Sequence, residues 1–275
     1  MKSSLRLKNA RIAVFDSGIG GLTVAREIMK LLPNEGIIYL GDTARVPYGT
    51  KSKRTVTRFS SQALCFLLNL KAKLIVIACN TVSALSFKTL EAKCPLPLIG
   101  VLEPGAREAV QATRNRIIGV IGTEATIRSR VYPKIINSLD PKMKVFGKSC
   151  PLLVPLVEEA WFRHQVTREV ISIYLKPLLR QGIDTLILGC THYPLLKETL
   201  QKVVGDKVAL IDSAQEVARQ VKRVLWEQKL RATNSPGHDF FVSDRPTRFI
   251  RLTKTFLGKP IKNVHQINLD SSEKY

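Results

Sequence analysis

The chain contains Lys73-Leu-Ile-Val-Ile-Ala-Cys79-Asn80-Thr81 and Thr185-Leu-Ile-Leu-Gly-Cys190-Thr191-His192, two stretches of the same design. In each, an apolar run ends at a cysteine, and small polar residues follow at once. Continuous apolar runs of this length are typical of parallel strands that are buried on both faces. We therefore expect Cys79 and Cys190 at the carboxyl ends of central strands, which is where open α/β sheets bind ligands.

Apolar runs alternate with helix-like segments along the whole chain, which is the pattern of βαβ units and a parallel sheet. We expect strands at Arg11–Phe15, Gly36–Leu40, Lys73–Ala78, Leu98–Val101, Arg116–Ile121, Met143–Phe146, Asp184–Leu188, Val208–Ile211 and His238–Val242. Apolar residues recur at intervals of three and four, as surface helices require, at Leu22–Leu32, Thr55–Leu70 and Glu216–Lys229. A last helix is predicted at Pro246–Leu257.

The two halves of the sequence resemble each other. Arg11-Ile-Ala-Val-Phe-Asp16-Ser17 is similar to Ile117-Ile-Gly-Val-Ile-Gly122-Thr123, so that Asp16 lies 106 positions before Gly122, and Cys79 lies 111 positions before Cys190. Similar offsets indicate two copies of one α/β domain. We predict two open, mostly parallel-sheet α/β domains related by pseudo-twofold symmetry, with an active site in the cleft between them.

We place the domain boundary near Gly100-Val-Leu-Glu-Pro104-Gly105, because proline and glycine end the preceding element and permit a hinge. The chain is expected to cross back near Asp212-Ser213. The N-terminal domain then comprises residues 1–100 and 213–275, and the C-terminal domain comprises residues 101–212. Asn234-Ser-Pro-Gly237 is predicted to be a loop, and residues 259–275 a loose tail.

The formal charge is +21 for 275 residues, from 43 basic and 22 acidic side chains. The basic residues are spread along the chain, and the densest cluster, Lys51-Ser-Lys53-Arg54, is short. This charge is consistent with a solvated basic surface, with attraction of anionic substrates, or with a nucleic-acid partner. Binding of nucleic acid, as the sole or a secondary function, therefore stays open as the alternative to an enzyme.

The chain has five cysteines, an odd number without the density of a secreted disulfide scaffold, and no apolar signal segment follows the basic Met1–Lys8. No apolar run reaches the roughly 18 to 20 residues that span a bilayer. We expect a cytoplasmic protein without membrane contact. We expect no metal, because CxxC is absent and the four histidines show no ligand spacing. The Gly-x-Ser-x-Gly elbow of many hydrolases is also absent.

Two further loops follow predicted strands. Asp16-Ser17-Gly18-Ile19-Gly20-Gly21 leads into a helix whose free N–H groups can bind a carboxylate, although Asp16 or Ser17 acting only as a helix cap explains the pattern equally well. The second loop, Gly41-Asp-Thr-Ala-Arg-Val-Pro-Tyr48-Gly49, is too polar for a core. Tyr48 and the Gly49 amide can hold a small polar ligand there, as many loops do.

A single cysteine after a strand is most often an inert buried residue. Two cysteines in matching surroundings indicate instead a reaction that needs a proton acceptor and a proton donor on opposite faces of one small molecule. Hydrogen-bond donors lie beside each sulfur, in Asn80-Thr81 and in Thr191-His192, and such donors favour a thiolate.

These residues resemble the aspartate/glutamate racemase family, and within it the glutamate racemases, which use no cofactor and supply D-glutamate for peptidoglycan. The similarity runs from about residue 12 to residue 257 and is carried by Phe15-Asp-Ser-Gly-Ile-Gly-Gly-Leu-Thr-Val24, Gly41-Asp-Thr-Ala-Arg-Val-Pro-Tyr-Gly49, Ala78-Cys-Asn-Thr-Val-Ser-Ala84, Val154-Pro-Leu-Val-Glu-Glu159 and Gly189-Cys-Thr-His-Tyr-Pro-Leu-Leu196. Aspartate racemases typically carry a glutamate at the position of His192.

The resemblance implies a role for each site residue. Cys79 removes the α-proton of D-glutamate and Cys190 that of L-glutamate, while Asp16 and His192 assist them and Glu158 is a further polar group of the site. The implied substrate-binding positions are Asp16, Ser17, Tyr48, Gly49, Asn80, Thr81, Thr191 and His192. Glutamate is the expected substrate, and we expect no cofactor and a homodimer.

Overall fold

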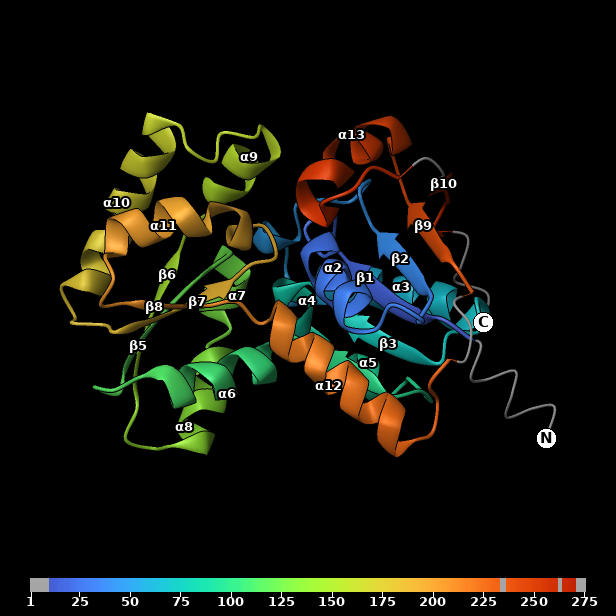
Figure 1. Ribbon diagram of the computed structural model, residues 1–275, viewed down its shortest axis with the longest axis horizontal. Helices are drawn as coiled ribbons and strands as arrows, with labels where there is room; N and C mark the ends of the chain where they lie inside the picture. Colours follow the sequence, from blue (N-terminus) through green and yellow to red (C-terminus); the bar gives the residue numbers. More distant parts are fainter. Residues whose placement is uncertain (1–9, 233–235, 262–263, 271–275) are drawn as a thin grey trace.

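The computed structural model describes residues 10–232, 236–261 and 264–270. All strand pairs in these residues are parallel, and they form two separate sheets that lie side by side (Figure 1). The predicted fold class, α/β with two parallel sheets, is therefore confirmed.

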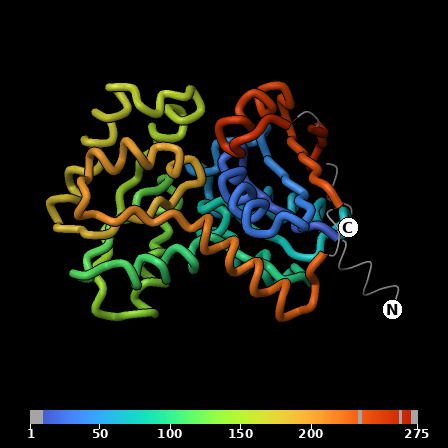
Figure 2. The backbone as a smooth tube through the Cα atoms, in the orientation of Figure 1, coloured from blue at the N-terminus to red at the C-terminus, as the bar shows by residue number. Residues whose placement is uncertain are grey.

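The first sheet has the strand order β10-β9-β2-β1-β3-β4. Its centre is fully buried, as the apolar runs predict, in β1 (Ile12–Asp16), β2 (Ile37–Gly41) and β3 (Leu74–Ile77). The flanking strands are β4 (Leu98–Gly100), β9 (His238–Val242) and β10 (His265–Gln266). The last part of the chain thus returns to the first sheet, and Figure 2 shows the red C-terminal segment beside the blue N-terminal one.

The second sheet has the strand order β6-β5-β7-β8. Its strands are β5 (Ile117–Gly122), β6 (Lys144–Ser149), β7 (Thr185–Gly189) and β8 (Ala209–Ile211). This order repeats the β2-β1-β3-β4 part of the first sheet, so that β5 corresponds to β1 and β7 corresponds to β3. The internal resemblance of the sequence therefore reflects a repeated topology.

Helices cover both sheets and fill the connections between strands. They are α2 (Leu22–Leu31), α3 (Lys53–Asn69), α4 (Asn80–Leu85), α5 (Phe87–Glu91), α6 (Leu102–Ala112), α7 (Glu124–Arg128), α8 (Val131–Leu139), α9 (Leu153–Glu158), α10 (Gln165–Leu179), α11 (Lys197–Val204), α12 (Ala214–Glu227) and α13 (Pro246–Leu257), with short 3-10 turns η1 (Tyr48–Thr50) and η2 (Tyr193–Leu196).

Side chains alternate along each strand, so the first sheet has two apolar faces. Val14 and Val76 belong to one core cluster, together with apolar residues of α2, α12 and α13. Phe15 and Ile77 belong to a second cluster, which α3 covers. The first cluster continues through α12 and α6 into the second sheet. One continuous apolar core therefore joins the two halves of the molecule.

Two expectations about the chain outside the strands are wrong. Pro104 and Gly105, expected in the connection between the domains, both lie in the first turn of α6; a proline fits there, since the first N–H groups of a helix have no helical partner. Residues 259–275 are not a loose tail throughout, because β10 pairs with β9 and Leu269 is 2% exposed. A strand of two residues leaves no periodicity to detect.

Residues 1–9, 233–235, 262–263 and 271–275 lie outside the described residues, so the first two positions of the loop predicted at 234–237 are not described. Within the described part of the chain, no helix has both the length and the apolar character needed to cross a membrane. The two sheets fall on either side of the predicted domain boundaries at residues 100 and 213, and the boundaries themselves stay a prediction.

Candidate active site

Both cysteines follow corresponding strands and line the same cavity. Cys79 lies two residues after β3 and directly before α4, and Cys190 directly follows β7. The two residues are 5% and 7% exposed. They line a cavity of about 210 Å³ whose walls come from both halves of the molecule.

This cavity brings together nearly every residue that the sequence singles out. Its lining includes Ser17, Tyr48, Gly49, Cys79, Asn80, Thr81, Glu158, Cys190, Thr191 and His192. Asp16 is the exception. It is 1% exposed and lies beneath the cavity, where its carboxylate accepts hydrogen bonds from the Gly18 N–H at 3.0 Å and from the Thr191 hydroxyl at 3.4 Å.

Sequence reasoning missed several residues that line the cavity. They are Gly18, Val46, Pro47, Thr123, Val154 and Pro155. Thr123 is the most telling of these, because its hydroxyl lies 2.9 Å from that of Thr81. The internal repeat contains the signal, since Thr123 follows β5 as Ser17 follows β1. The aliphatic lining from α9, Val154 and Pro155, stands in the 154–159 motif that carries the family resemblance, but its apolar side chains gave no reason to assign them to the site.

The Cys79 sulfur is held as a thiol by its surroundings. Its S–H donates to Ser17 Oγ at 3.4 Å. Burial, followed by the negative charge of Asp16, raises the pKa of Cys79 to about 12, although the Ser17 hydroxyl and the Val82 N–H oppose this rise. Cys79 therefore carries its proton at neutral pH.

Cys190 has an imidazole beside it, where the corresponding neighbour of Cys79 is Thr81. His192 Nδ1 lies 3.9 Å from Cys190 Sγ, and His192 Nε2 lies 3.1 Å from Glu158 Oε1. Burial disfavours a charged imidazole, but the interactions with Cys190 and Glu158 outweigh it and raise the pKa of His192 to about 10. His192 is therefore an imidazolium at neutral pH, and its positive charge lies beside the Cys190 sulfur.

Glu158 connects this imidazolium to the first half of the molecule. Its Oε1 bonds to His192, and its Oε2 accepts a hydrogen bond from Arg248 of α13 at 3.0 Å. Burial raises the pKa of Glu158, but the His192 hydrogen bond and the charges of His192 and Arg248 lower it overall. Glu158 is therefore a carboxylate that joins His192 to α13.

Asp16 is electrostatically coupled to both cysteine turns. Burial raises the pKa of Asp16, and the charge of His192 is the largest influence that opposes this rise. The same carboxylate raises the pKa of Cys79. Asp16 can therefore transmit a change of charge from the Cys190 side of the cavity to the Cys79 side.

Two glycines allow the halves of the site to approach each other. A Cβ at Gly20 would overlap Thr191 Oγ1 and lie 2.6 Å from His192 Nδ1. A Cβ at Gly49 would lie 2.6 Å from the Cβ of Thr123. A side chain at either position would push the two walls of the cavity apart.

A metal role for these residues was not expected. Among residues 10–232, 236–261 and 264–270, no group of three or more histidine, cysteine, aspartate or glutamate side chains is arranged to hold a metal ion. The arrangement that the described residues do offer is a pair of buried thiols, each with its own acid/base surroundings, around a cavity large enough for a small molecule.

The model of the Asp/Glu/Hydantoin racemase family matches residues 20–221, which includes both cysteine turns. The chain belongs to this family. Membership makes it an isomerase of the racemase type. A curated glutamate racemase of Geobacter metallireducens is 49% identical over 264 residues, and the match covers 95% of this chain and 98% of the relative.

Solved structures of racemases have the same fold over nearly the whole chain. A glutamate racemase of Francisella tularensis, determined in complex with D-glutamate, superimposes with a TM-score of 0.91 at 38% identity and covers 96% of this chain and 99% of its own. A glutamate racemase isoform of Bacillus anthracis has a TM-score of 0.91 at 40% identity, with coverage of 95% and 98%. The family and the two-sheet architecture are therefore shown together.

Proposed function

We propose that this racemase interconverts L-glutamate and D-glutamate by a two-thiol acid/base mechanism. The observation that carries the proposal is that Cys79 and Cys190, which follow corresponding strands of two repeated sheets, line one small cavity. The resemblance to glutamate racemases over nearly the whole chain supports the choice of substrate.

Inversion at Cα needs a base on one face of the substrate and an acid on the other, in opposite protonation states at the same time. In the proposed reaction, the Cys190 thiolate removes the α-proton of L-glutamate, and the Cys79 thiol delivers its proton to the opposite face. The reverse reaction starts with the Cys79 thiolate and D-glutamate. The raised pKa of Cys79 keeps this residue a thiol, which is the proton donor that the reaction of L-glutamate requires.

The α-proton of an amino acid is weakly acidic, so the charge that develops at Cα must be spread into the substrate carboxylate and met there by fixed donors. We assign this role to the polar groups of the cavity wall at Ser17, Asn80, Thr81 and Thr191, together with the Gly49 amide. Glu158 and Asp16 act at a distance from Cα, through His192 and through the local charge. No cofactor is part of this proposal.

The experiment that tests the proposal is a circular dichroism assay of the purified protein with L-glutamate or D-glutamate and no added cofactor. The signal of both enantiomers should decay to zero. We expect selectivity over aspartate, because a shorter side chain would leave polar groups of the pocket unpaired, which is costly in a buried site. Equal turnover of aspartate would contradict the assigned substrate, and no decay with any amino acid would contradict the activity.

Several finer inferences belong to the same proposal. The D-glutamate would serve peptidoglycan synthesis, and the protein would act in the cytoplasm as a homodimer. All five cysteines are free, as expected in a reducing compartment. The alternative of nucleic-acid binding receives no support from relatives that are named as racemases.

A further inference from the structure

Behind the cavity loop lies a buried carboxylate that the proposed mechanism does not use. Asp42 is 0% exposed. Its Oδ2 accepts a hydrogen bond from Arg45 Nε at 2.7 Å and another from the Tyr48 hydroxyl, and its Oδ1 accepts one from Ser243 Oγ at 2.8 Å. A buried carboxylate is stable only with such partners, so these three donors and Asp42 form one connected unit.

The Tyr48 side chain lines the cavity, yet its hydroxyl is directed to Asp42. Burial and the neighbouring carboxylate raise the pKa of Tyr48 well above its usual range. The phenol therefore keeps its proton and donates a hydrogen bond to Asp42. Tyr48 therefore lines the cavity while its hydroxyl is engaged by Asp42. The turn η1 that it begins also carries Gly49, which packs against Thr123 of the other half.

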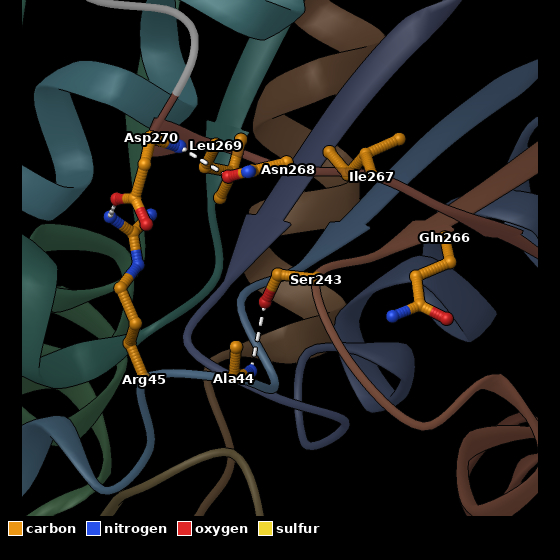
Figure 3. A pocket seen from close by; sticks show the side chains of 8 residues that line it. All are labelled: Ala44, Arg45, Ser243, Gln266, Ile267, Asn268, Leu269 and Asp270. Atoms are coloured by element: carbon orange, nitrogen blue, oxygen red, sulfur yellow. Dashed lines mark hydrogen bonds and ion pairs between the residues drawn. The ribbon is translucent and has the colours of Figure 1, made fainter.

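Arg45 supports Asp42 and is itself held by residues outside the loop. Its guanidinium stacks on Phe59, with Cζ 4.2 Å from the ring centre, and it bonds to Gln62. It also lies 3.4 Å from the exposed Asp270, and Figure 3 shows the two side chains extending toward each other. The arginine is thus held in place from several directions while it donates to Asp42.

Asp42 is also held by Ser243, a residue from the C-terminal part of the chain. Ser243, directly after β9, accepts a hydrogen bond from the Ala44 N–H at 2.8 Å (Figure 3) while it donates to Asp42. A second cavity, of about 500 Å³, lies between this loop and residues 266–270 and contains neither cysteine. Ser243 and residues 266–270 lie beyond residues 20–221, the part that the family model matches, whereas Asp42 and Arg45 lie within it.

We propose that Asp42 is a positioning residue for substrate binding. Arg45 and Ser243 hold the Asp42 carboxylate in place, and Asp42 in turn fixes the Tyr48–Gly49 turn at the wall of the cavity. This inference rests on the proposed racemisation of glutamate. Because the turn contacts both halves of the molecule, loss of its anchor displaces a wall of the site without removing any acid/base group.

The test compares Asp42→Asn, Tyr48→Phe and the double variant with the wild type in the circular dichroism assay. Asp42→Asn should raise KM for both enantiomers about tenfold while kcat falls less than about threefold, because the lost interaction positions substrate in ground state and transition state alike. If the Tyr48 hydroxyl acts only through Asp42, the double variant should be no worse than Asp42→Asn.

Asp239→Asn is the matched control. It removes another arginine–aspartate pair of the first sheet, Arg11 with Asp239 at 2.5 Å, which does not touch the loop. It should lower the melting temperature and leave KM unchanged, which separates positioning from general destabilisation. Should Asp42→Asn fail to fold, Ser243→Ala tests the same anchor and should raise KM about threefold.

If the wild type racemises glutamate, three results would overturn the inference. The first is an unchanged KM in folded Asp42→Asn, or in Ser243→Ala if Asp42→Asn does not fold, and the second is a loss in that variant that affects kcat alone. The third is additive effects of Asp42→Asn and Tyr48→Phe, which would place the Tyr48 hydroxyl on the substrate. An inactive wild type would instead contradict the proposed function itself.

Discussion

The turn at Cys79 and the turn at Cys190 begin alike and end in different chemical surroundings. Each follows the strand next to the first strand of its half, β3 beside β1 and β7 beside β5. Two positions after the sulfur, however, stands Thr81 in one turn and His192 in the other. The fold thus places two equal groups around one cavity, and the residues beside them make the groups unequal.

The difference teaches how one protein can hold an acid and a base of the same residue type. Burial and Asp16 keep the proton on Cys79 by raising its pKa to about 12. His192, held by Glu158, puts a positive charge beside Cys190. Two cysteines in identical surroundings would tend to share one protonation state, which cannot transfer a proton across a substrate. The asymmetry is therefore part of the proposed mechanism.

Replacing either sulfur should give the largest effect. Cys79→Ser and Cys190→Ser should each reduce net racemisation by about 10³-fold or more, because serine is far too weak a base at neutral pH. The circular dichroism assay with each enantiomer measures this loss, and unchanged melting temperatures would verify that both variants fold. Near wild-type activity in either one would end the two-thiol mechanism.

Isotope exchange tests whether the two faces are separate. In D₂O, the wild type should place deuterium at Cα of the newly formed enantiomer, since the incoming proton comes from a thiol that has exchanged with solvent. Proton NMR or mass spectrometry of the product in early turnover gives the deuterium content. The two-thiol mechanism is falsified if the product enantiomer keeps most of its protium, because one shared base would return it.

The second largest effect should come from the group that distinguishes the two turns. His192→Asn should lower kcat about 10²-fold, the lower end of what acid/base assistance contributes, because it removes the cation beside Cys190. Thr81→Val, at the corresponding position of the other turn, is the matched variant and should cost less, since Thr81 supplies only a hydroxyl. Equal losses would mean that the imidazole has no special part in the proton transfer.

Much of this comparison follows from the sequence, and the missing part has a physical reason. The apolar runs identify the central strands, and β9 and α13 begin and end where predicted. The polar residues after each strand end identify the cavity wall. Pairings between distant residues leave no local pattern, so neither the Glu158–Arg248 contact, 90 positions apart, nor the Ser243–Asp42 contact, 201 positions apart, could be predicted.

The two turns should also differ in how they make stability depend on pH. The pKa of His192 is raised from 6.5 to about 10 in the folded protein. Its stabilising effect is complete below pH 6.5 and is lost as pH rises toward 10. The pKa of Cys79 is raised from 9.0 to about 12, so ionisation of this thiol lowers the free energy of unfolding as pH rises from 9 toward 12.

Urea denaturation between pH 6 and pH 11 separates the two contributions. The wild type should lose free energy of unfolding across both intervals. His192→Asn should flatten the decline between pH 6.5 and pH 10, while Cys79→Ser should flatten only the decline above pH 9. A wild-type profile without any decline between pH 6.5 and pH 9 would show that His192 is not held as an imidazolium.

The smallest effect should come from Arg248, which contacts Glu158, the carboxylate that holds His192 beside Cys190. The Arg248 side chain is 43% exposed where it meets Glu158, and ion pairs of this kind contribute about 1 kcal/mol or less. Arg248→Gln should therefore change kcat/KM by no more than about fivefold. Glu158→Gln should cost more, because it removes the carboxylate that holds His192 Nε2.

The matched control for this pair is Arg107→Gln, which breaks an exposed pair with Glu103 on α6 that touches no residue of the cavity. It should leave kcat/KM unchanged at every salt concentration. Added salt screens exposed charges, so it should narrow the difference in kcat/KM between wild type and Arg248→Gln. The lower kcat/KM of Glu158→Gln should persist in salt. Arg248→Gln could instead prove as damaging as His192→Asn. The imidazolium would then depend on α13 of the other half. The asymmetry of the two cysteine turns would in that case arise from the contact between the halves and not from the residues beside each sulfur.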